Sequence, residues 1–226
     1  MIDLANIKNL YFIGIGGIGM SALARYCKQL DKNVSGYDKT PTPLTNQLIG
    51  EGVDITFTDH PDEVEWETLD HGSSLVVYTP AIPADHSIYN AFKDRGFTIV
   101  KRAVLLGAVT KDTYCLAVAG THGKTTTSAI LGHLLAACDM PVTAFLGGIA
   151  ENYNSNFISK GTSITVVEAD EFDRSFMHLS PDIACITSMD ADHLDIYGDA
   201  QTIEEGFKEF ADLLPDTRSL WVPNLD

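Results

Sequence analysis

Two glycine-rich segments of the sequence have residue types that bind phosphate groups. The first, GIGGIG, runs from Gly14 to Gly19 and fits the pattern G-x-G-x-x-G. The second, GTHGKTT, runs from Gly120 to Thr126 and ends in the G-K-[ST] of a phosphate-binding loop. Glycines let backbone N–H groups approach a phosphate at a helix N-terminus, where the helix dipole favours anions. The chain therefore carries two predicted anion sites.

The first glycine segment predicts a site for a dinucleotide or a nucleoside diphosphate. It follows an apolar run and precedes a helical pattern, which is the context that makes the motif informative. Asp38 comes nineteen residues after Gly19, at the end of the next expected strand, where a carboxylate could accept a hydrogen bond from a ribose hydroxyl. The segment alone does not choose between NAD and a nucleotide sugar, and a turn needed only for close helix packing is the structural alternative.

The second glycine segment predicts a site for a nucleoside triphosphate, formed by a variant of the phosphate-binding loop. Val118 stands where the full G-x-x-x-x-G-K-[ST] pattern has its first glycine. We expect Lys124 to reach the terminal phosphates and Thr125 to offer its hydroxyl to magnesium. A lysine about 4 Å from a phosphate charge contributes roughly 4 kcal/mol at an effective dielectric constant near 20. The alternative is a helix start that binds nothing.

Two acidic clusters follow the second glycine segment. The first is EADEFD, from Glu168 to Asp173, and the second is DADHLD, from Asp190 to Asp195, which includes His193. Both come after expected strands, and the carboxyl ends of parallel strands share one edge of a sheet with the phosphate-binding loop. Carboxylates would repel a nucleotide there unless a cation lay between them, so the clusters predict magnesium. Exposed acidic loops are the structural alternative.

The elements that must position these groups alternate between short apolar runs and helical patterns, which predicts an α/β fold with parallel sheets. A Rossmann-like domain is expected over residues 1–107, followed by part of a P-loop ATPase α/β domain over 108–226, with the boundary near Gly107. The expected strands are 9–15, 33–37, 53–57, 74–79, 97–100, 113–120, 142–146, 163–169, 182–188 and 219–222. Beyond the two helices that follow the glycine segments, the second of them over 124–137, helices are expected near 43–50, 85–95 and 201–214.

Composition excludes several classes of function. Thirty-one acidic and fifteen basic residues give a net charge of −16, which repels nucleic acid and anionic membrane surfaces. The four cysteines are far apart and suit free thiols better than a zinc site or disulfides. The sequence begins without the pattern of a signal peptide and has no long uncharged apolar run. We expect a cytoplasmic protein.

Four motifs in order resemble those of the Mur ligases: GIGGIGMS, GTHGKTTT, EADEFDRSF followed by LSPDIACIT, and MDADHLDIYG. The resemblance spans nearly the whole chain. It implies a three-domain enzyme with a UDP-sugar domain, a central ATPase domain and a C-terminal domain that helps bind an amino acid. The chain would then hold the first domain and the opening part of the second. We therefore expect a fragment that does not ligate by itself.

Within that family, the motifs are most similar to those of the member that acts on UDP-N-acetylmuramate and L-alanine. The resemblance implies that ATP phosphorylates the lactyl carboxylate and that the alanine amine then attacks the acyl phosphate. It implies catalytic roles for Lys124, Glu168 and His193, and Mg²⁺ ligands at Thr125, Glu168 and His193. ATP would be bound by Gly120, Thr121, His122, Gly123, Lys124, Thr125 and Thr126. The UDP-sugar would contact Gly14, Gly16, Gly17, Gly19, Met20, Ser21, Asp38, Thr79 and Arg102.

The sequence departs from the family pattern at two places. Phe172 replaces a serine that relatives often carry, and Ser188-Met189-Asp190 replaces an asparagine-isoleucine-glutamate run. Three alternatives stay open: a ligase that attaches a recycled tripeptide to the same UDP-sugar, a nicotinamide-dependent oxidoreductase that uses the first glycine segment, and a fragment that only binds the UDP-sugar. Some relatives use a carbamylated lysine, but no lysine here is assigned to that role.

Overall fold

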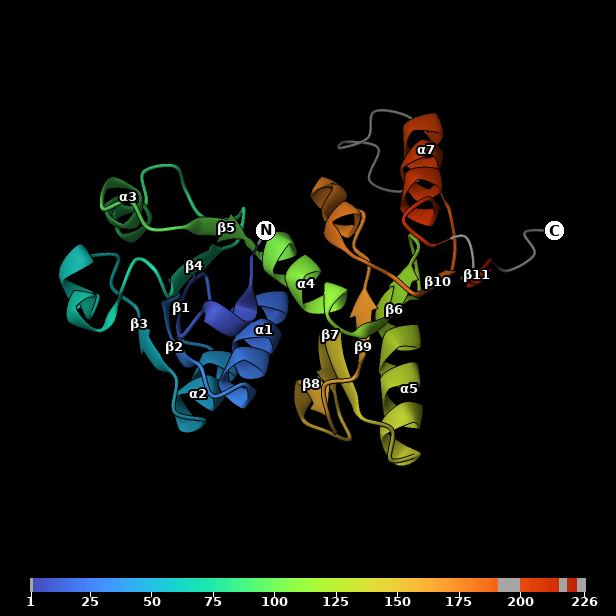
Figure 1. Ribbon diagram of the computed structural model, residues 1–226, viewed down its shortest axis with the longest axis horizontal. Coiled ribbons are helices and arrows are strands. Elements are labelled where there is room, and N and C mark those ends of the chain that lie inside the picture. Colours follow the sequence, from blue (N-terminus) through green and yellow to red (C-terminus); the bar gives the residue numbers. More distant parts are fainter. Residues whose placement is uncertain (1, 191–199, 216–218, 223–226) are drawn as a thin grey trace. The chain divides into compact units, whose positions relative to one another are not determined.

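The chain forms two compact α/β units, Met1–Leu105 and Leu106–Asp226. The computed structural model in Figure 1 describes residues 2–190, 200–215 and 219–222. The predictions for His193 and for the acids Asp192 and Asp195 lie outside these residues. The α/β fold class is confirmed, and in the described part of the chain no helix combines the length and the apolar character required to cross a membrane.

The first unit is built on a five-stranded parallel sheet in the order β3-β2-β1-β4-β5. Its strands are β1 (Asn9–Ile13), β2 (Asn33–Tyr37), β3 (Asp54–Thr56), β4 (Ser74–Tyr78) and β5 (Ile99–Lys101). The chain moves outward from β1 to β3 and then returns to the other side of β1 at β4. The carboxyl ends of β1 and β4 therefore flank a topological switch point, which is where ligands bind in open parallel sheets.

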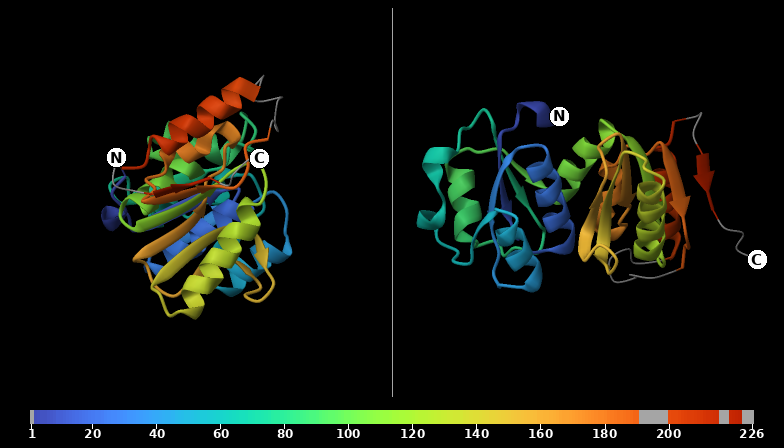
Figure 2. Two further views of the ribbon diagram at one scale, coloured as in Figure 1. Left: turned by 90° about the vertical axis from the view of Figure 1, so that its right-hand side faces the viewer. Right: turned by 90° about the horizontal axis from the view of Figure 1, so that it is seen from below.

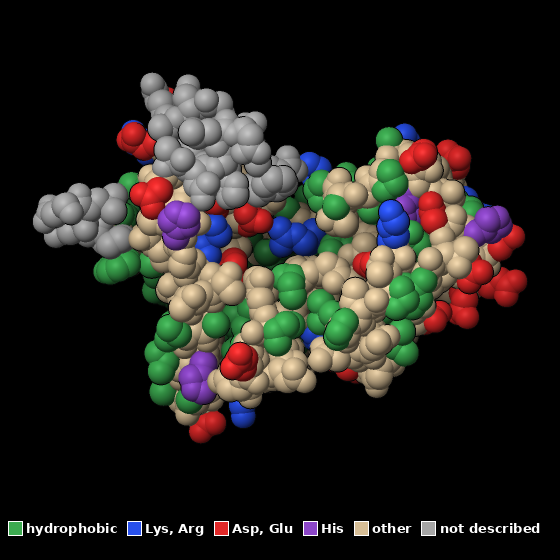
Figure 3. Space-filling view, turned by 180° about the vertical axis from the view of Figure 1, so that it is seen from behind, with side chains coloured by type: hydrophobic (Ala, Val, Ile, Leu, Met, Phe, Trp, Pro, Cys, Tyr) green, Lys and Arg blue, Asp and Glu red, His purple; other side chains and the backbone are tan. Residues whose placement is uncertain are grey.

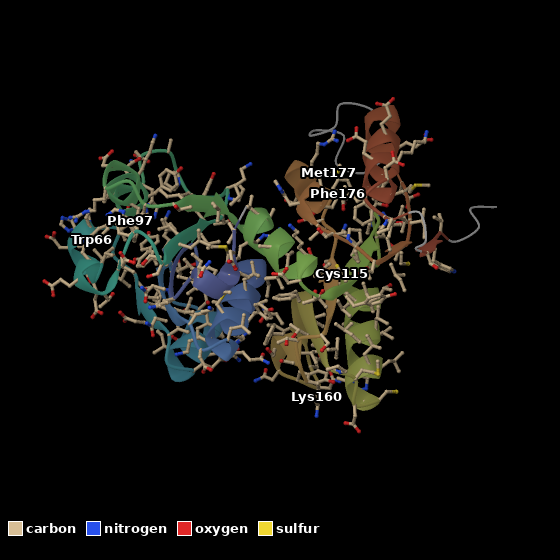
Figure 4. The ribbon with its side chains drawn as sticks, viewed as in Figure 1. Trp66, Phe97, Cys115, Lys160, Phe176 and Met177 are labelled. Atoms are coloured by element: carbon tan, nitrogen blue, oxygen red, sulfur yellow. The ribbon has the colours of Figure 1, made fainter. Side chains whose placement is uncertain are left out.

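Helices and short turns cover both faces of this sheet (Figures 1 and 2). The helices are α1 (Ile18–Gln29), α2 (Pro43–Gly50), α3 (Ser87–Asp94) and the start of α4 (Arg102–Lys111), and 3₁₀ turns lie at Leu4–Asn6, Pro61–Glu63 and Trp66–Thr68. Helix α2 begins where the sequence provides a capping box between Thr42 and Thr45, with a proline in the first turn. Trp66 and Phe97 pack with their rings 6.2 Å apart beside the buried side chain of Phe92 (Figure 4).

The second unit has a six-stranded sheet in the order β11-β10-β6-β9-β7-β8. Its strands are β6 (Tyr114–Ala119), β7 (Val142–Ala150), β8 (Ser155–Ser159), β9 (Ile164–Glu168), β10 (Ile183–Ile186) and β11 (Ser219–Trp221). All neighbours are parallel except β7 and β8, which form an antiparallel pair. Helix α5 (Lys124–Ala137) packs against β6, β7 and β9, whereas α7 (Ala200–Ala211) packs against the 3₁₀ segment η4 (Phe172–His178).

Helix α4 and strand β8 are not among the expected helices and strands. Helix α4 was not predicted, because its sequence RAVLLGAVTK is apolar on nearly every side and shows no helical stripe. Strand β8 was missed because SNFIS is short and only two of its residues, Asn156 and Ile158, are buried. The two compact units divide between Leu105 and Leu106, inside α4, two residues before the expected boundary at Gly107.

Charge is unevenly spread over the first unit. Acidic side chains gather at one end of the face drawn in Figure 3. The loop between β3 and β4 contributes five exposed acids: Asp62, Glu63, Glu65, Glu67 and Asp70. A field of this sign does not attract phosphates, so an anionic ligand has to be held by local contacts.

Candidate functional site

The first glycine turn lies directly after β1, at the switch point of the first sheet. The carboxylate of Asp38, which follows β2, accepts a hydrogen bond from the backbone N–H of Gly16 at 2.7 Å. A Cβ atom added at Gly16 would lie 2.8 Å from that carboxylate oxygen and 2.7 Å from the methyl group of Thr45. Only glycine fits this turn without displacing its neighbours, and in this structure Asp38 holds the turn itself.

Two more predicted residues lie beside the same turn. Thr79 follows β4, and its side chain occupies the space that a Cβ atom at Gly14 would need. The guanidinium of Arg102, at the start of α4, lies where a Cβ atom at Gly19 would approach Nη1 to 2.9 Å. The structure therefore gathers Gly14, Gly16, Gly19, Asp38, Thr79 and Arg102 at one edge of the sheet.

Met20 and Ser21 are placed differently from the other predicted UDP-sugar residues. Both lie in the first turn of α1, where Met20 is 2% exposed and Ser21 is fully buried. The Ser21 hydroxyl donates to the carbonyl of Ile18. The two side chains therefore pack inside the protein, and they support the turn rather than facing solvent beside it.

The second glycine segment connects β6 to α5. Gly120 has a φ of +124° and Gly123, which precedes the first residue of α5, has a φ of +81°, and glycine reaches these values without strain. The segment after β10 fastens this loop: the Ser188 hydroxyl lies 2.8 Å from the Thr121 hydroxyl and accepts from the backbone N–H of His122 at 2.9 Å. The Thr187 hydroxyl donates to the His122 carbonyl.

Lys124 is fixed by three hydrogen bonds. Its ammonium donates to the carbonyl of Gly120 at 2.6 Å and to both carboxylate oxygens of Glu171 at 2.8 and 3.0 Å. The Glu171 residue is only 3% exposed. Because Gly120 and Lys124 belong to the same loop, these contacts hold the ammonium over the loop.

Glu168, the last residue of β9, is also held from three sides. Its carboxylate accepts from the Thr125 hydroxyl at 3.1 Å, from the Ser128 hydroxyl at 3.1 Å and from the backbone N–H of Gly147 at 2.5 Å. The first two donors are in α5 and the third is in β7. A Cβ atom at Gly147 would collide with the carboxylate, so a glycine there allows the close approach.

The donor set at this point fits a magnesium ion. Mg²⁺ commonly uses one or two protein oxygens and fills its remaining positions with water and substrate phosphates. The Thr125 hydroxyl and the Glu168 carboxylate are such oxygens, and they already lie in contact beside the loop. Among the described residues, no three His, Cys, Asp or Glu side chains form a complete metal cluster. These two oxygens could therefore form part of the coordination shell of a cation that also contacts phosphate.

Several residues of this site could not be singled out from the sequence. Ser128 and Gly147, and the role of Glu171 within its acidic cluster, depend on contacts that only the fold creates, since the partners lie 21 or more residues away. Thr187 and Ser188 are the last two residues of the expected strand 182–188, whereas in the structure they lie just after β10, which ends at Ile186. His122 is exposed, with its ring 3.7 Å from the Asp190 carboxylate, and Thr126 is exposed on α5.

Comparison with family models covers nearly the whole chain. Residues 9–114 match the model described as "Mur ligase family, catalytic domain", and residues 118–226 match the "Mur ligase middle domain". The UDP-N-acetylmuramate–L-alanine ligase of Flavobacterium psychrophilum is 60% identical over 223 residues, which cover 99% of this chain and 50% of that protein. The chain spans about half the length of the curated relatives it matches.

Solved structures of two named ligases illustrate the similarity of this fold to known proteins. The UDP-N-acetylmuramate-alanine ligase of Thermotoga maritima aligns with a TM-score of 0.82 at 30% identity, over 96% of this chain and 49% of that one. The UDP-N-acetylmuramate:L-alanyl-gamma-D-glutamyl-meso-diaminopimelate ligase of Neisseria meningitides aligns with a TM-score of 0.86 at 25% identity, over 97% of this chain and 72% of that one.

Proposed function

The chain belongs to the Mur ligase family, and from this premise we propose that the whole protein joins L-alanine to UDP-N-acetylmuramate at the expense of ATP. The bond formed is an amide between the alanine amine and the lactyl carboxylate, made through an acyl phosphate, as a step of peptidoglycan synthesis. The 60% identity to a ligase of that name supports this substrate pair. Because the chain spans half of such relatives, the activity is assigned to the full-length protein.

We assign one ligand to each unit, with residues 1–107 as the UDP-sugar domain and 108–226 as the opening part of the ATPase domain. In the first unit the turn after β1, together with Asp38, Thr79 and Arg102, would bind the UDP-sugar. In the second unit the loop from Gly120 to Thr126 would bind ATP. Two anion sites in separate sheets suit a reaction that brings a sugar nucleotide and a nucleoside triphosphate together, and we place it in the cytoplasm.

The residues of the second unit would perform three tasks. Lys124 would donate to the phosphate that is transferred, stabilising the charge of the transition state. Thr125 and Glu168 would hold Mg²⁺, which neutralises phosphate charge when it is bound. Ser128 and Gly147 would keep the Glu168 carboxylate in place through the hydrogen bonds described above. His193 is proposed as a further metal-binding residue from its motif alone.

The observation that carries the proposal is the contact between Thr125 and Glu168 at 3.1 Å. These residues are 43 positions apart, and they meet beside the loop that holds Lys124. A hydroxyl, a carboxylate and an ammonium so arranged suit a phosphate chain with its cation. A nicotinamide enzyme would have no use for this second site.

A phosphate-release assay on the full-length protein tests the proposal. We expect release from ATP only when UDP-N-acetylmuramate and L-alanine are both present, and we expect none from Lys124→Ala. Equal turnover with the tripeptide L-alanyl-γ-D-glutamyl-meso-diaminopimelate and poor turnover with alanine would instead identify the recycling ligase. Tight binding of NADH to the chain, weakened by Gly16→Val, would refute both ligase assignments.

A further inference from the structure

The ion pair between Lys124 and Glu171 lies beside the second glycine loop and is largely buried. The side chain of Glu171 is 4% exposed and that of Lys124 is 16% exposed. Burying a carboxylate costs free energy unless the charge is paired, so Glu171 needs a cation beside it, unlike an exposed surface acid. The partial magnesium site formed by Thr125 and Glu168 does not include this carboxylate.

The backbone around Glu171 is itself fixed. Glu171 precedes η4, and its carbonyl accepts from the N–H of Arg174 at 2.9 Å. The N–H of Phe176 donates to the carbonyl of Asp170, and the Phe176 ring is buried against Phe207 and Phe210 of α7 (Figure 4). The carboxylate is therefore presented by a turn anchored in the core.

The contacts of the ammonium limit what it can do when a nucleotide arrives. A lysine ammonium has three N–H donors, and here they are directed at the carbonyl of Gly120 and the two oxygens of Glu171. The ammonium can donate to a phosphate oxygen only if it gives up one of its hydrogen bonds to Gly120 or Glu171. A phosphate chain also brings negative charge toward a buried carboxylate, and the two repel.

We propose that Glu171 is a positioning residue for Lys124. It holds the ammonium over the loop before nucleotide binds, and it opposes a phosphate chain that arrives without a divalent cation. This inference rests on the proposed role of the loop as the ATP site. Glu171 makes the site prefer the magnesium complex over the metal-free nucleotide. Glu168 and Thr125 bind the cation itself.

The test compares Glu171→Gln and Glu171→Asp with a matched control, Glu51→Gln. Glu51 also pairs with a cation, Arg25, at 2.9 and 3.0 Å, but it lies in the first unit. Binding of the non-hydrolysable analogue AMP-PNP is measured by calorimetry with and without Mg²⁺, and turnover is measured in the full-length protein. Thermal melts establish that each variant is folded.

We expect Glu171→Gln to bind metal-free AMP-PNP about tenfold more tightly than the wild type. Addition of Mg²⁺ should then raise its affinity for AMP-PNP much less than it raises that of the wild type. Its kcat should fall at least tenfold, since the lysine is no longer held. Glu171→Asp keeps the negative charge but moves it away from Lys124, because the side chain is one methylene shorter. Its affinity for metal-free AMP-PNP should therefore stay weak while kcat falls. Glu51→Gln should match the wild type in all three measurements.

Two results would overturn the inference. One is a Glu171→Gln protein that binds metal-free nucleotide no more tightly than the wild type, which is the outcome of a merely structural role. The other, decisive if Glu171→Gln does not fold, is a Glu171→Asp protein with wild-type kcat. A wild-type protein that binds no nucleotide in the presence of Mg²⁺ would instead refute the proposed function.

Discussion

Replacing Gly147 by alanine tests whether the position of the Glu168 carboxylate matters to nucleotide binding. Gly147 has no positive φ, so alanine can adopt its backbone conformation. The new Cβ atom, however, would collide with the Glu168 carboxylate, whose Cδ lies 2.9 Å from that position. The carboxylate must move, and it loses the hydrogen bond that the Gly147 N–H now donates.

The size of the effect follows from the bond that is lost. A hydrogen bond to a charged group contributes about 1.5–3 kcal/mol, which corresponds to roughly a 10- to 150-fold change in an equilibrium constant. If Mg²⁺ is bound where Glu168 and Thr125 meet, the loss should appear in the affinity for the Mg²⁺ complex of AMP-PNP, measured by calorimetry. Affinity for metal-free nucleotide should change little.

Gly50→Ala provides the control, because a Cβ atom at Gly50 meets nothing within 4 Å. It should leave both affinities unchanged. If the Gly147→Ala protein binds the magnesium complex as tightly as the wild type does, the idea that Glu168 must lie against β7 is refuted. Equal losses with and without metal would show that the loop, rather than the cation site, had been disturbed.

Three further predictions concern stability and reactivity. Burial lowers the pKa of His86 below its ordinary 6.5 against the pull of two nearby carboxylates, so the stability it contributes is present above about pH 6.5 and is lost as the pH falls below that value. In urea melts of His86→Asn, which keeps a helix-capping acceptor, the free energy of unfolding should fall less between pH 7 and 5 than in the wild type. The same pH dependence in both proteins would contradict this. Gly36→Ala should lower the free energy of unfolding by about 1–3 kcal/mol, because its Cβ atom would strike the Phe12 carbonyl in the neighbouring strand; an unaltered melt would count against the packing described. Burial raises the pKa of Cys115 to about 12, so a disulfide reagent at pH 8 should label the exposed Cys138 first, and rapid labelling that survives Cys138→Ser would contradict that order.

The sequence was sufficient to predict the parts of the fold that depend on local patterns. Helix α5 begins at Lys124 and ends at Ala137, as expected from the glycine–lysine junction and the apolar run that follows. Helix α2 has the bounds expected from its proline and polar start. Such elements carry their own start signals, so their limits do not depend on distant contacts.

The rest depends on tertiary contacts that no local pattern encodes. Glu171 could be recognised as one acid in a cluster, but its pairing with Lys124 spans 47 positions and is created by the neighbouring positions of β6 and β9. Ser188 lies two residues after β10, and only the structure reveals that its hydroxyl contacts the second glycine loop. Asp38 was expected to face a ribose, whereas here it binds the N–H of Gly16.

The central claim is that the chain has two independent anion sites, one for a sugar nucleotide and one for ATP. Calorimetric titration of Mg²⁺–AMP-PNP into the chain already saturated with UDP-N-acetylmuramate tests it most directly. We predict that one equivalent still binds, that Lys124→Ala abolishes only this event, and that Gly16→Val abolishes only binding of the UDP-sugar. Displacement of one ligand by the other, or loss of both with either variant, would contradict the account.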